Sequence, residues 1–202
     1  MRKIIAGLFI SLDGVVEAPD EWHFPYFDEQ MGQAVGSQMS DTILLGRKTY
    51  DSFAGAWPDR EAGGEEDAEF AKILGDARKI VVSNQDLDFT WRNTEQLRGD
   101  LVESVAALKG EPGGRISMSG SISVVRQLLA AGLLDELHLL VHPIAVQHGM
   151  RLFEDGQDAV PLKLLSSEAF GSGVLYLVYG PDEAREGGYA EAKAHLGRSE
   201  EE

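Results

Sequence analysis

Short apolar runs recur along the chain, separated by segments whose apolar residues return at helical spacing. Such runs indicate strands, and strands that alternate with helices are typical of an α/β architecture. The pattern predicts strands at Lys3–Ile10, Asp41–Leu45, Lys79–Ser83, Arg115–Ser119 and Glu136–Val141, and a terminal pair at Lys163–Leu165 and Gly173–Tyr179. We therefore expect a mostly parallel sheet with an antiparallel C-terminal edge.

Three helices are predicted between these strands. Phe27–Met39 has a helical pattern, and Asp100–Glu103 has the form of a capping box that opens a helix running to about Lys109. Ser121–Ala131 gives the clearest pattern, because its apolar residues fall on one face and Gly132 is placed to end it.

Three other segments are typical of loops. Asp59–Asp67 is predicted to be an acidic surface loop, and Gly110–Gly114 a plain turn. From Pro181 onward the composition shifts to Glu, Ala, Gly and Lys, which is typical of a solvated tail. We expect one domain over residues 1–180 and an acidic tail over 181–202.

Composition and charge then exclude several classes of function. The 202 residues carry a formal net charge of −16, which opposes nucleic-acid binding, and include no cysteine, which excludes thiolate chemistry. No apolar run approaches the roughly 20 residues of a membrane span. Because Met1–Ile5 passes directly into a strand pattern, we expect no signal peptide and a cytoplasmic location.

The segment Ile43–Tyr50 is a candidate anion site. An apolar strand there runs into Gly46, then Arg47, Lys48 and Thr49, where a helix is expected to begin. A helix start presents unpaired N–H groups and partial positive charge, so it holds phosphate well. The alternative is a glycine turn with two solvated cations.

Two further strand ends carry small polar residues. The third predicted strand ends at Ser83 and Asn84, and the fourth turns through Ser119, Gly120 and Ser121 into a helix. Ligands of open α/β sheets bind outside the carboxyl ends of the strands, so these turns are expected to line one groove. A Ser-Gly-Ser turn also serves simply as a helix cap. Neither common glycine-rich nucleotide loop is present.

The order of these motifs resembles the dihydrofolate-reductase-like superfamily. Within it, the chain is similar to stand-alone bacterial proteins related to the C-terminal reductase domain of the bifunctional riboflavin-biosynthesis enzyme. The resemblance covers roughly residues 3–180 and rests on the succession Ile10–Gly14, Trp22–Asp28, Leu45–Tyr50, Ile80–Ser83, Ser119–Ser121, Leu134–Leu137 and Pro143–Phe153.

The resemblance implies an α/β domain of three layers that binds NADPH. The implied cofactor-binding residues are Gly14, Gly46, Arg47, Lys48, Thr49, Ser83, Asn84, Ser119, Gly120, Ser121 and Ile122. Among them, the turn at Ser119–Ile122 would cradle the pyrophosphate through backbone N–H groups. Arg47 and Lys48 would favour NADPH over NADH, because a further phosphate rewards added positive charge.

Hydride transfer to a C=N or C=O carbon leaves charge on the heteroatom, so a proton source or an electrostatic stabiliser is needed. Asp13 and Asp28 are the candidate catalytic and substrate-binding carboxylates, with Glu29 in reserve. Each aspartate has a structural alternative, an Asx turn for Asp13 and a helix-start carboxylate for Asp28.

Aromatic residues between the first strand and the first helix are candidates for substrate binding. Trp22 and Tyr26, with Phe24 and Phe27, would form a wall for a flat heterocycle, or else pack as the core of the loop. We expect no metal, because the histidines at positions 23, 138, 142 and 148 lack helical ligand spacing.

The chain also departs from the riboflavin reductases. They usually carry Glu-Gly-Gly where this chain has Met118–Gly120, and relatives more often have a glycine at or near Gln147. We therefore expect an NADPH-dependent reductase of a small heterocyclic or carbonyl substrate, with a ribosylaminopyrimidine as one candidate. A pteridine or dihydrofolate reductase and a non-catalytic nucleotide-binding protein are the alternatives. Relatives are often homodimers, and we expect a homodimer here. The apolar segment Val174–Tyr179 is either covered on both faces or paired with a second subunit.

Overall fold

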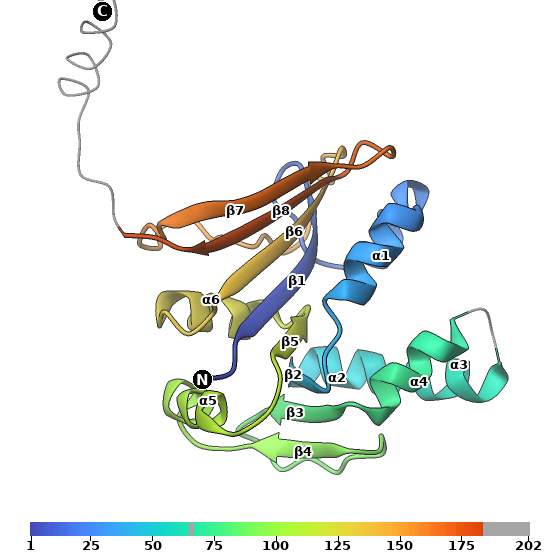
Figure 1. Cartoon of the computed structure of the whole chain (residues 1–202), viewed down its shortest axis with the longest axis vertical. Helices are drawn as coiled ribbons and strands as arrows, with labels where there is room; N and C mark the ends of the chain where they lie inside the picture. Colours follow the sequence, from blue (N-terminus) through green and yellow to red (C-terminus); the bar gives the residue numbers. More distant parts are fainter. Residues whose placement is uncertain (65–66, 184–202) are drawn as a thin grey trace, which may run out of the picture.

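A computed structural model describes residues 1–64 and 67–183 of the chain. One eight-stranded sheet runs through it in the order β4-β3-β2-β5-β1-β6-β8-β7 (Figure 1). The strands are β1 (Ile4–Ser11), β2 (Thr42–Gly46), β3 (Arg78–Val82), β4 (Thr94–Leu97), β5 (Ile116–Ser119), β6 (Glu136–His142), β7 (Leu162–Ala169) and β8 (Leu175–Pro181).

The sheet has the expected mixed topology. The pairs from β4 across to β6 are all parallel, whereas β8 runs antiparallel to both β6 and β7. Apolar runs such as Thr42–Leu45 are buried throughout, as parallel strands covered on both faces require. The predicted mostly parallel sheet with an antiparallel C-terminal edge is therefore confirmed.

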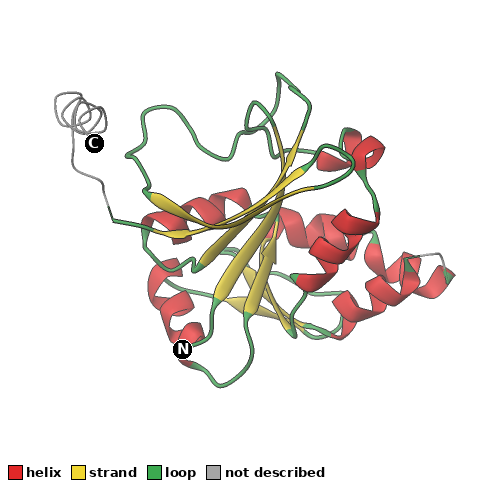
Figure 2. Cartoon of the chain, turned by 45° about the horizontal axis from the view of Figure 1, so that its top comes forward, coloured by secondary structure: helices red, strands yellow, loops and turns green. Residues whose placement is uncertain are grey.

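Helices cover both faces of the sheet, which gives three layers (Figure 2). Side chains of α5 (Leu101–Gly110) and α6 (Ile122–Ala130) pack with the even-numbered residues of β1 in one core. On the opposite face, α1 (Glu29–Ser37) covers β1, β6 and β8. The helices α2 (Arg47–Ala54) and α4 (Ala68–Asp76) cover β2 and β3 on that same face. A further helix, α3 (Trp57–Gly63), contacts α4.

The predicted loop at Asp59–Asp67 is wrong in its described part. Most of it belongs to α3, which starts with Pro58 in its first turn, where proline needs no N–H partner. The helix ends at Gly63 and is capped by Gly64, whose φ of 66° lies in the left-handed region. The adjacent glycines Gly63 and Gly64 mark the end of a helix rather than a continuous loop. Residues 65–66 lie outside the described part of the chain, as does the tail from residue 184.

The other predicted helices and strands begin and end within a few residues of the boundaries expected from the sequence. Asp100 caps α5 by accepting a hydrogen bond from Glu103 N at 3.0 Å, as predicted. Gly132, with a φ of 65°, follows the end of α6, also as predicted. The first helix begins at Glu29 because Asp28 is its cap. The short strand β4 and the helix α4 were not anticipated.

Lys79 is a fully buried cation that secures the start of β3. Its ammonium donates to the carbonyl oxygens of Leu74, Gly75 and Ala77 at 2.8 to 2.9 Å, and so caps the end of α4. It also lies 4.4 Å from the ring centre of Trp91. Burial lowers the pKa of Lys79 to about 8. The lysine therefore fixes where β3 starts, and with it the position of Ser83.

A chain of polar contacts, exposed at Lys3 and buried at His138, links the start of β1 to β6 and β8 on the face that α1 covers. Lys3 pairs with Glu136 at 2.9 Å, Glu136 contacts His138 Nε2 at 3.1 Å, and His138 Nδ1 lies 2.6 Å from the Tyr176 hydroxyl. Burial lowers the pKa of His138. A neutral ring that donates to Glu136 and accepts from Tyr176 satisfies both nitrogens, so the chain helps to fix the β6–β8 register.

The apolar strand β8 lies between β6 and β7, so its backbone is paired on both sides. Its sequence therefore requires no second subunit, and the homodimer stays a prediction. In residues 1–64 and 67–183, none of the helices combines the length and hydropathy needed to cross a membrane.

Candidate functional site

The polar turns predicted from the sequence lie along one edge of the sheet. Strands β3, β2, β5 and β1 are adjacent and parallel, so their carboxyl ends share that edge. The turn at Ser83 follows β3, the bend at Gly46 follows β2, the bend at Ser119 follows β5, and Asp13 follows β1. In parallel sheets this edge is where ligands bind.

The bends at Gly46 and Ser119 contact each other directly. Gly46 N donates to the Ser121 hydroxyl oxygen at 2.8 Å, and Ser121 N donates to the Thr49 hydroxyl oxygen at 3.0 Å. We call this pair of hydrogen bonds the latch. It joins the start of α2 to the start of α6, so the two helix starts form one unit.

The latch determines which donors are left for an anion. The N–H groups of Gly46 and Ser121 are engaged, so they are not available to cradle a phosphate as expected. The Thr49 and Ser121 hydroxyls accept these bonds, and each keeps a hydrogen that it can donate. The Ser121 N–H, which was expected to help cradle the pyrophosphate, is therefore occupied within the protein, and the rest of the expected cradle at Ser119–Ile122 stays a prediction.

Close packing explains the glycines and the strain at these bends. A Cβ on Gly120 would lie 3.2 Å from Thr49, and Gly120 has a φ of 68°. Ser121 also adopts the left-handed region, with a φ of 57°, which is unfavourable for a residue other than glycine. Its hydrogen bond from Gly46 helps to hold that conformation. Ser119, by contrast, takes no left-handed conformation.

Cationic groups lie beside the latch. Arg47 contacts the Gln85 side chain and lies 3.5 Å from Asp51, with its side chain about half exposed. Lys48 is exposed and forms no ion pair in the described parts of the chain. The chain therefore offers local positive charge at the bend despite its acidic total.

The turn after β3 is closed by its own hydrogen bonds. The Ser83 hydroxyl lies 3.1 Å from Gln85 N, and Gln96 Nε2 donates to the carbonyl oxygens of Ser83 and Gln85 at 2.8 and 2.7 Å. Asn84 is exposed at the tip. Gln85 and Gln96 were missed in the sequence because neither lies in a recognisable motif. They fix the turn and connect it to Arg47.

Asp13 secures a loop rather than facing outward as a free acid. Its carboxylate accepts hydrogen bonds from Ser11 Oγ at 2.7 Å, Val146 N at 3.0 Å and Gln147 N at 2.9 Å. The Ser11 hydrogen bond is the main cause that lowers the pKa of Asp13 to about 2, with the two amides adding to it. An ionised, fully engaged carboxylate is a poor proton donor. These contacts favour a structural role over the catalytic one, and that role is a link to the loop at Val146 and Gln147 rather than an Asx turn.

Further contacts join the same two loops. Met150 N donates to Glu17 Oε2 at 2.7 Å, and Leu152 N donates to the Gly14 carbonyl oxygen at 2.9 Å. Gly14 has a φ of 86°, which its turn requires. Gln147 has a φ of 68°, so the position where relatives more often carry glycine is left-handed here as well.

Asp28 is the N-cap of α1. One carboxylate oxygen accepts from Met31 N at 2.8 Å, and this bond is the main reason why its pKa is lowered. Because its pKa is lowered, the Asp28 carboxylate is ionised at neutral pH. The residue is half-buried. It can accept a hydrogen bond from a ligand, but it does not store a proton for delivery. Its neighbour Glu29 is exposed.

The aromatic residues between β1 and α1 gather around histidines. Trp22 is buried, and its ring centre lies 5.2 Å from that of His142, while Tyr26 lies 5.8 Å from the same ring. Phe24 and Phe27 remain about half exposed. Trp22 therefore belongs to the core of the loop, and the ligand wall stays a prediction.

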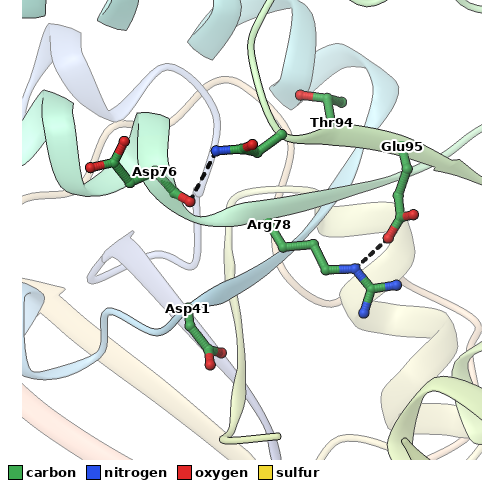
Figure 3. Close-up of a pocket in the computed structure, with 6 residues that line it drawn as sticks. Asp41, Asp76, Arg78, Thr94 and Glu95 are labelled. Atoms are coloured by element: carbon green, nitrogen blue, oxygen red, sulfur yellow. Dashed lines mark hydrogen bonds and ion pairs between the residues drawn. The ribbon is translucent and has the colours of Figure 1, made fainter.

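One cavity in the described residues lies away from this edge. It has a volume of about 510 Å³ and is lined by Asp41, Asp76, Arg78, Asn93, Thr94 and Glu95, at the amino ends of β2, β3 and β4 (Figure 3). Arg78 is already paired with Glu95 and Glu111. Since the strands are parallel, this cavity lies at the opposite edge from the bends. Residues 1–64 and 67–183 include no group of three or more acidic or histidine side chains placed to hold a metal ion.

Comparison with known proteins places the chain in a family. The family model of the RibD C-terminal domain matches residues 2–176. The chain belongs to the RibD C-terminal domain family. Two Bacillus subtilis (strain 168) relatives are similar to it over nearly their whole length. The uncharacterized protein YyaP is 31% identical over 88% of this chain and 94% of its own, and the uncharacterized protein YwjB is 27% identical over 86% and 95%.

Solved structures share the fold of this RibD C-terminal domain. A putative riboflavin biosynthesis protein from Shewanella sp. PV-4 aligns with a TM-score of 0.69 at 18% identity, covering 91% of this chain and all of that one. A pyrimidine reductase-like protein from Corynebacterium diphtheriae gives 0.64 at 17%, covering 91% and 93%. Dihydrofolate reductase from Enterococcus faecalis, complexed with NADP(H) and RAB-propyl, gives 0.60 at 16%, covering 90% and 97%. The predicted dihydrofolate-reductase-like fold is confirmed.

The latch gives a first prediction. Thr49→Val keeps the shape of the side chain but removes the acceptor for Ser121 N, so we expect a loss of about 1–3 kcal/mol in the free energy of unfolding. Urea denaturation followed by circular dichroism measures it. Thr49→Ser keeps the hydroxyl and is expected to lose much less. Equal losses in the two variants would contradict the latch.

Asp13 gives a second prediction, on acid stability. Its pKa is about 2 in the folded protein and 3.8 ordinarily, so its stabilising effect is complete above about pH 4 and is lost as the pH falls toward 2. Asp13→Asn should lower stability at neutral pH and flatten the decline between pH 4 and 2. Urea midpoints measured across that range test this, with the exposed Asp88→Asn as control. If the urea midpoints of wild type and Asp13→Asn fell in parallel between pH 4 and 2, the stabilising role of the ionised Asp13 would be contradicted.

Proposed function

We propose that the protein is an NADPH-dependent reductase that transfers hydride to a small heterocyclic substrate of the ribosylaminopyrimidine type. The observation that carries the proposal is the latch, which brings two helix starts, two hydroxyl donors and two cations to one sheet edge. Membership of the RibD C-terminal domain family supports a reductase of riboflavin-biosynthesis type.

The residues at the bends suit a phosphate-bearing cofactor. A Cβ on Gly46 would lie 3.4 Å from Val124 and 3.5 Å from Ser121, so the bend has no room for a larger residue beside α6. Thr49 and Ser121 retain hydroxyl hydrogens, and the exposed Lys48 adds a charge that has no ion-pair partner within residues 1–64 and 67–183. When bound, NADPH supplies the hydride. The Enterococcus faecalis dihydrofolate reductase, which shares the fold, is complexed with NADP(H), and this supports NADPH as the proposed cofactor.

The chain's own residues have separate roles in this proposal. Arg47, Lys48 and the two hydroxyls hold phosphate, while the turn at Ser83 lies within reach of Arg47 through Gln85. The ionised Asp28 accepts a hydrogen bond from a ring N–H or an amino group and so orients the substrate. Because Asp13 and Asp28 are both ionised, the proton that follows hydride comes from water or from another group.

A third prediction tests the cofactor assignment. Arg47→Ala should weaken NADPH binding by about tenfold to a hundredfold, since it removes a charge-assisted hydrogen bond to the extra phosphate. NADH binding should change by less than about threefold, since NADH lacks that phosphate. Fluorescence titration with each nucleotide measures both. The control is Arg60→Ala on α3, which removes the same charge elsewhere and should change the binding of neither nucleotide. Equal losses of NADPH and NADH affinity in Arg47→Ala would show that Arg47 does not bind the extra phosphate.

A fourth prediction tests turnover. With 5-amino-6-(5-phosphoribosylamino)uracil or dihydrofolate present, NADPH absorbance should decline steadily. Asp28→Asn keeps a good N-cap but removes the charge, so stability should hold while kcat/KM drops by about tenfold or more. Asp59→Asn, an exposed first-turn aspartate of α3, is the control. The substrate that is consumed separates the pyrimidine from the pterin alternative. Tight NADPH binding without turnover on either would favour the non-catalytic alternative.

A further inference from the structure

Two buried imidazoles lie in the aromatic cluster beside the candidate site. His23 belongs to the segment between β1 and α1 and is 6% exposed, and His142, the last residue of β6, is fully buried. In the sheet register His142 pairs with Ser11, at the carboxyl end of β1. The two rings therefore lie at the sheet edge that carries the latch.

The ring of His23 occupies a slot that suits a flat heterocycle. It stacks on Phe9 with a centroid distance of 4.4 Å and an interplanar angle of 9°. Phe24 lies on it at 4.1 Å, and His142 meets it edge-on at 6.1 Å with an angle of 86°. The His23 ring thus lies between Phe9 and Phe24, with the imidazole of His142 beside its edge.

This arrangement leaves polar atoms without partners. His142 Nδ1 lies 2.8 Å from the Leu140 carbonyl oxygen, which can only accept, so Nδ1 carries the hydrogen and Nε2 presents a lone pair. Neither His142 Nε2 nor His23 Nδ1 has a hydrogen-bond partner among the described residues. Burial of such atoms without a partner is unfavourable. Burial, reinforced by His142, lowers the pKa of His23 to about 4, against a small opposite effect of Asp20.

The segment that carries His23 is weakly attached. The hydrogen bonds of residues 18–27 all join to partners within residues 17–27 of the described chain. The segment consists of two single-turn 3-10 helices, Pro19–Glu21 and Phe24–Tyr26, and begins at Ala18, a non-glycine residue with a φ of 42°. Packing of its aromatic rings holds this segment against the sheet. His23 can therefore leave without breaking backbone hydrogen bonds between the strands.

We propose that His23 is an internal placeholder in the substrate subsite, and that a planar, uncharged nitrogen heterocycle displaces it, stacks on Phe9 and places a hydrogen-bond donor on His142 Nε2. The proposal rests on the function proposed above and adds the location of the ring-binding subsite. It also explains why His23 tolerates an unpaired nitrogen, because the slot is shaped for another ring.

The first measurement uses the wild-type protein. Imidazole NMR signals titrated without ligand should give His23 a pKa near 4, the value for the buried ring. Saturation with 5,6-diaminouracil should expel the ring into water and return its pKa toward the ordinary 6.5. A His23 pKa that stays near 4 at saturation would overturn the proposal.

The second measurement removes the placeholder. His23→Gly should bind 5,6-diaminouracil at least about tenfold more tightly than the wild type, as expected if His23 fills the slot for more than about nine-tenths of the time. It should also bind free imidazole, which competes with the heterocycle. Calorimetry measures both, and circular dichroism checks folding. His148→Gly, which removes an exposed histidine, is the control and should bind like the wild type.

Weaker or unchanged heterocycle binding by His23→Gly would overturn the proposal, because a residue that contacts substrate loses affinity when it is removed. Absence of imidazole binding, or absence of any heterocycle binding by both proteins, would overturn it as well. Should the variant fail to fold, the wild-type NMR titration still decides. Neither measurement uses NADPH or turnover, so this inference can fail while the proposed reductase activity stands, and the reverse.

Discussion

The site depends on two hydrogen bonds between the loops that follow β2 and β5. Gly46 N binds the Ser121 hydroxyl oxygen and Ser121 N binds the Thr49 hydroxyl oxygen, so each bend satisfies a backbone donor of the other. Without this exchange, two partly buried N–H groups at adjacent helix starts would lack partners. In the same exchange both hydroxyls act as acceptors, so each keeps a hydrogen that it can donate, and the proposed anion site rests on these two donors.

Electrostatics at this edge are local. The chain is strongly acidic, yet Lys48 is exposed without an acidic partner in the described residues and Arg47 lies beside it. The two aspartates closest to the expected chemistry are held ionised by hydrogen bonds, Asp13 by Ser11 and two amides, and Asp28 by the start of α1. The edge thus combines two cations with carboxylates that fix loops or cap a helix.

Backbone strain gathers in the loops around the site. In residues 1–64 and 67–183, four residues other than glycine have positive φ, and Ala18, Ser121 and Gln147 lie in loops at the carboxyl edge of the sheet. Ser121 is held by the latch and Gln147 by the Asp13 carboxylate. Ala18 has no side-chain cap and opens the weakly attached segment that carries His23. Strained positions persist only where surrounding contacts fix them, so at Ala18 the ring packing of the segment that follows supplies that support.

By itself, the sequence determined the alternation of strands and helices, the mixed sheet and the polar bends at the strand ends, because apolar runs and turn residues act locally. The cap at Asp100 and the end at Gly132 were predictable for the same reason. Only the tertiary structure decided that Ser121 and Thr49 bind across 72 residues, that Asp13 fixes the loop at Gln147, and that His23 stacks on Phe9. These contacts join residues that are distant along the chain, and no local pattern encodes which hydroxyl, carboxylate or ring will meet which partner.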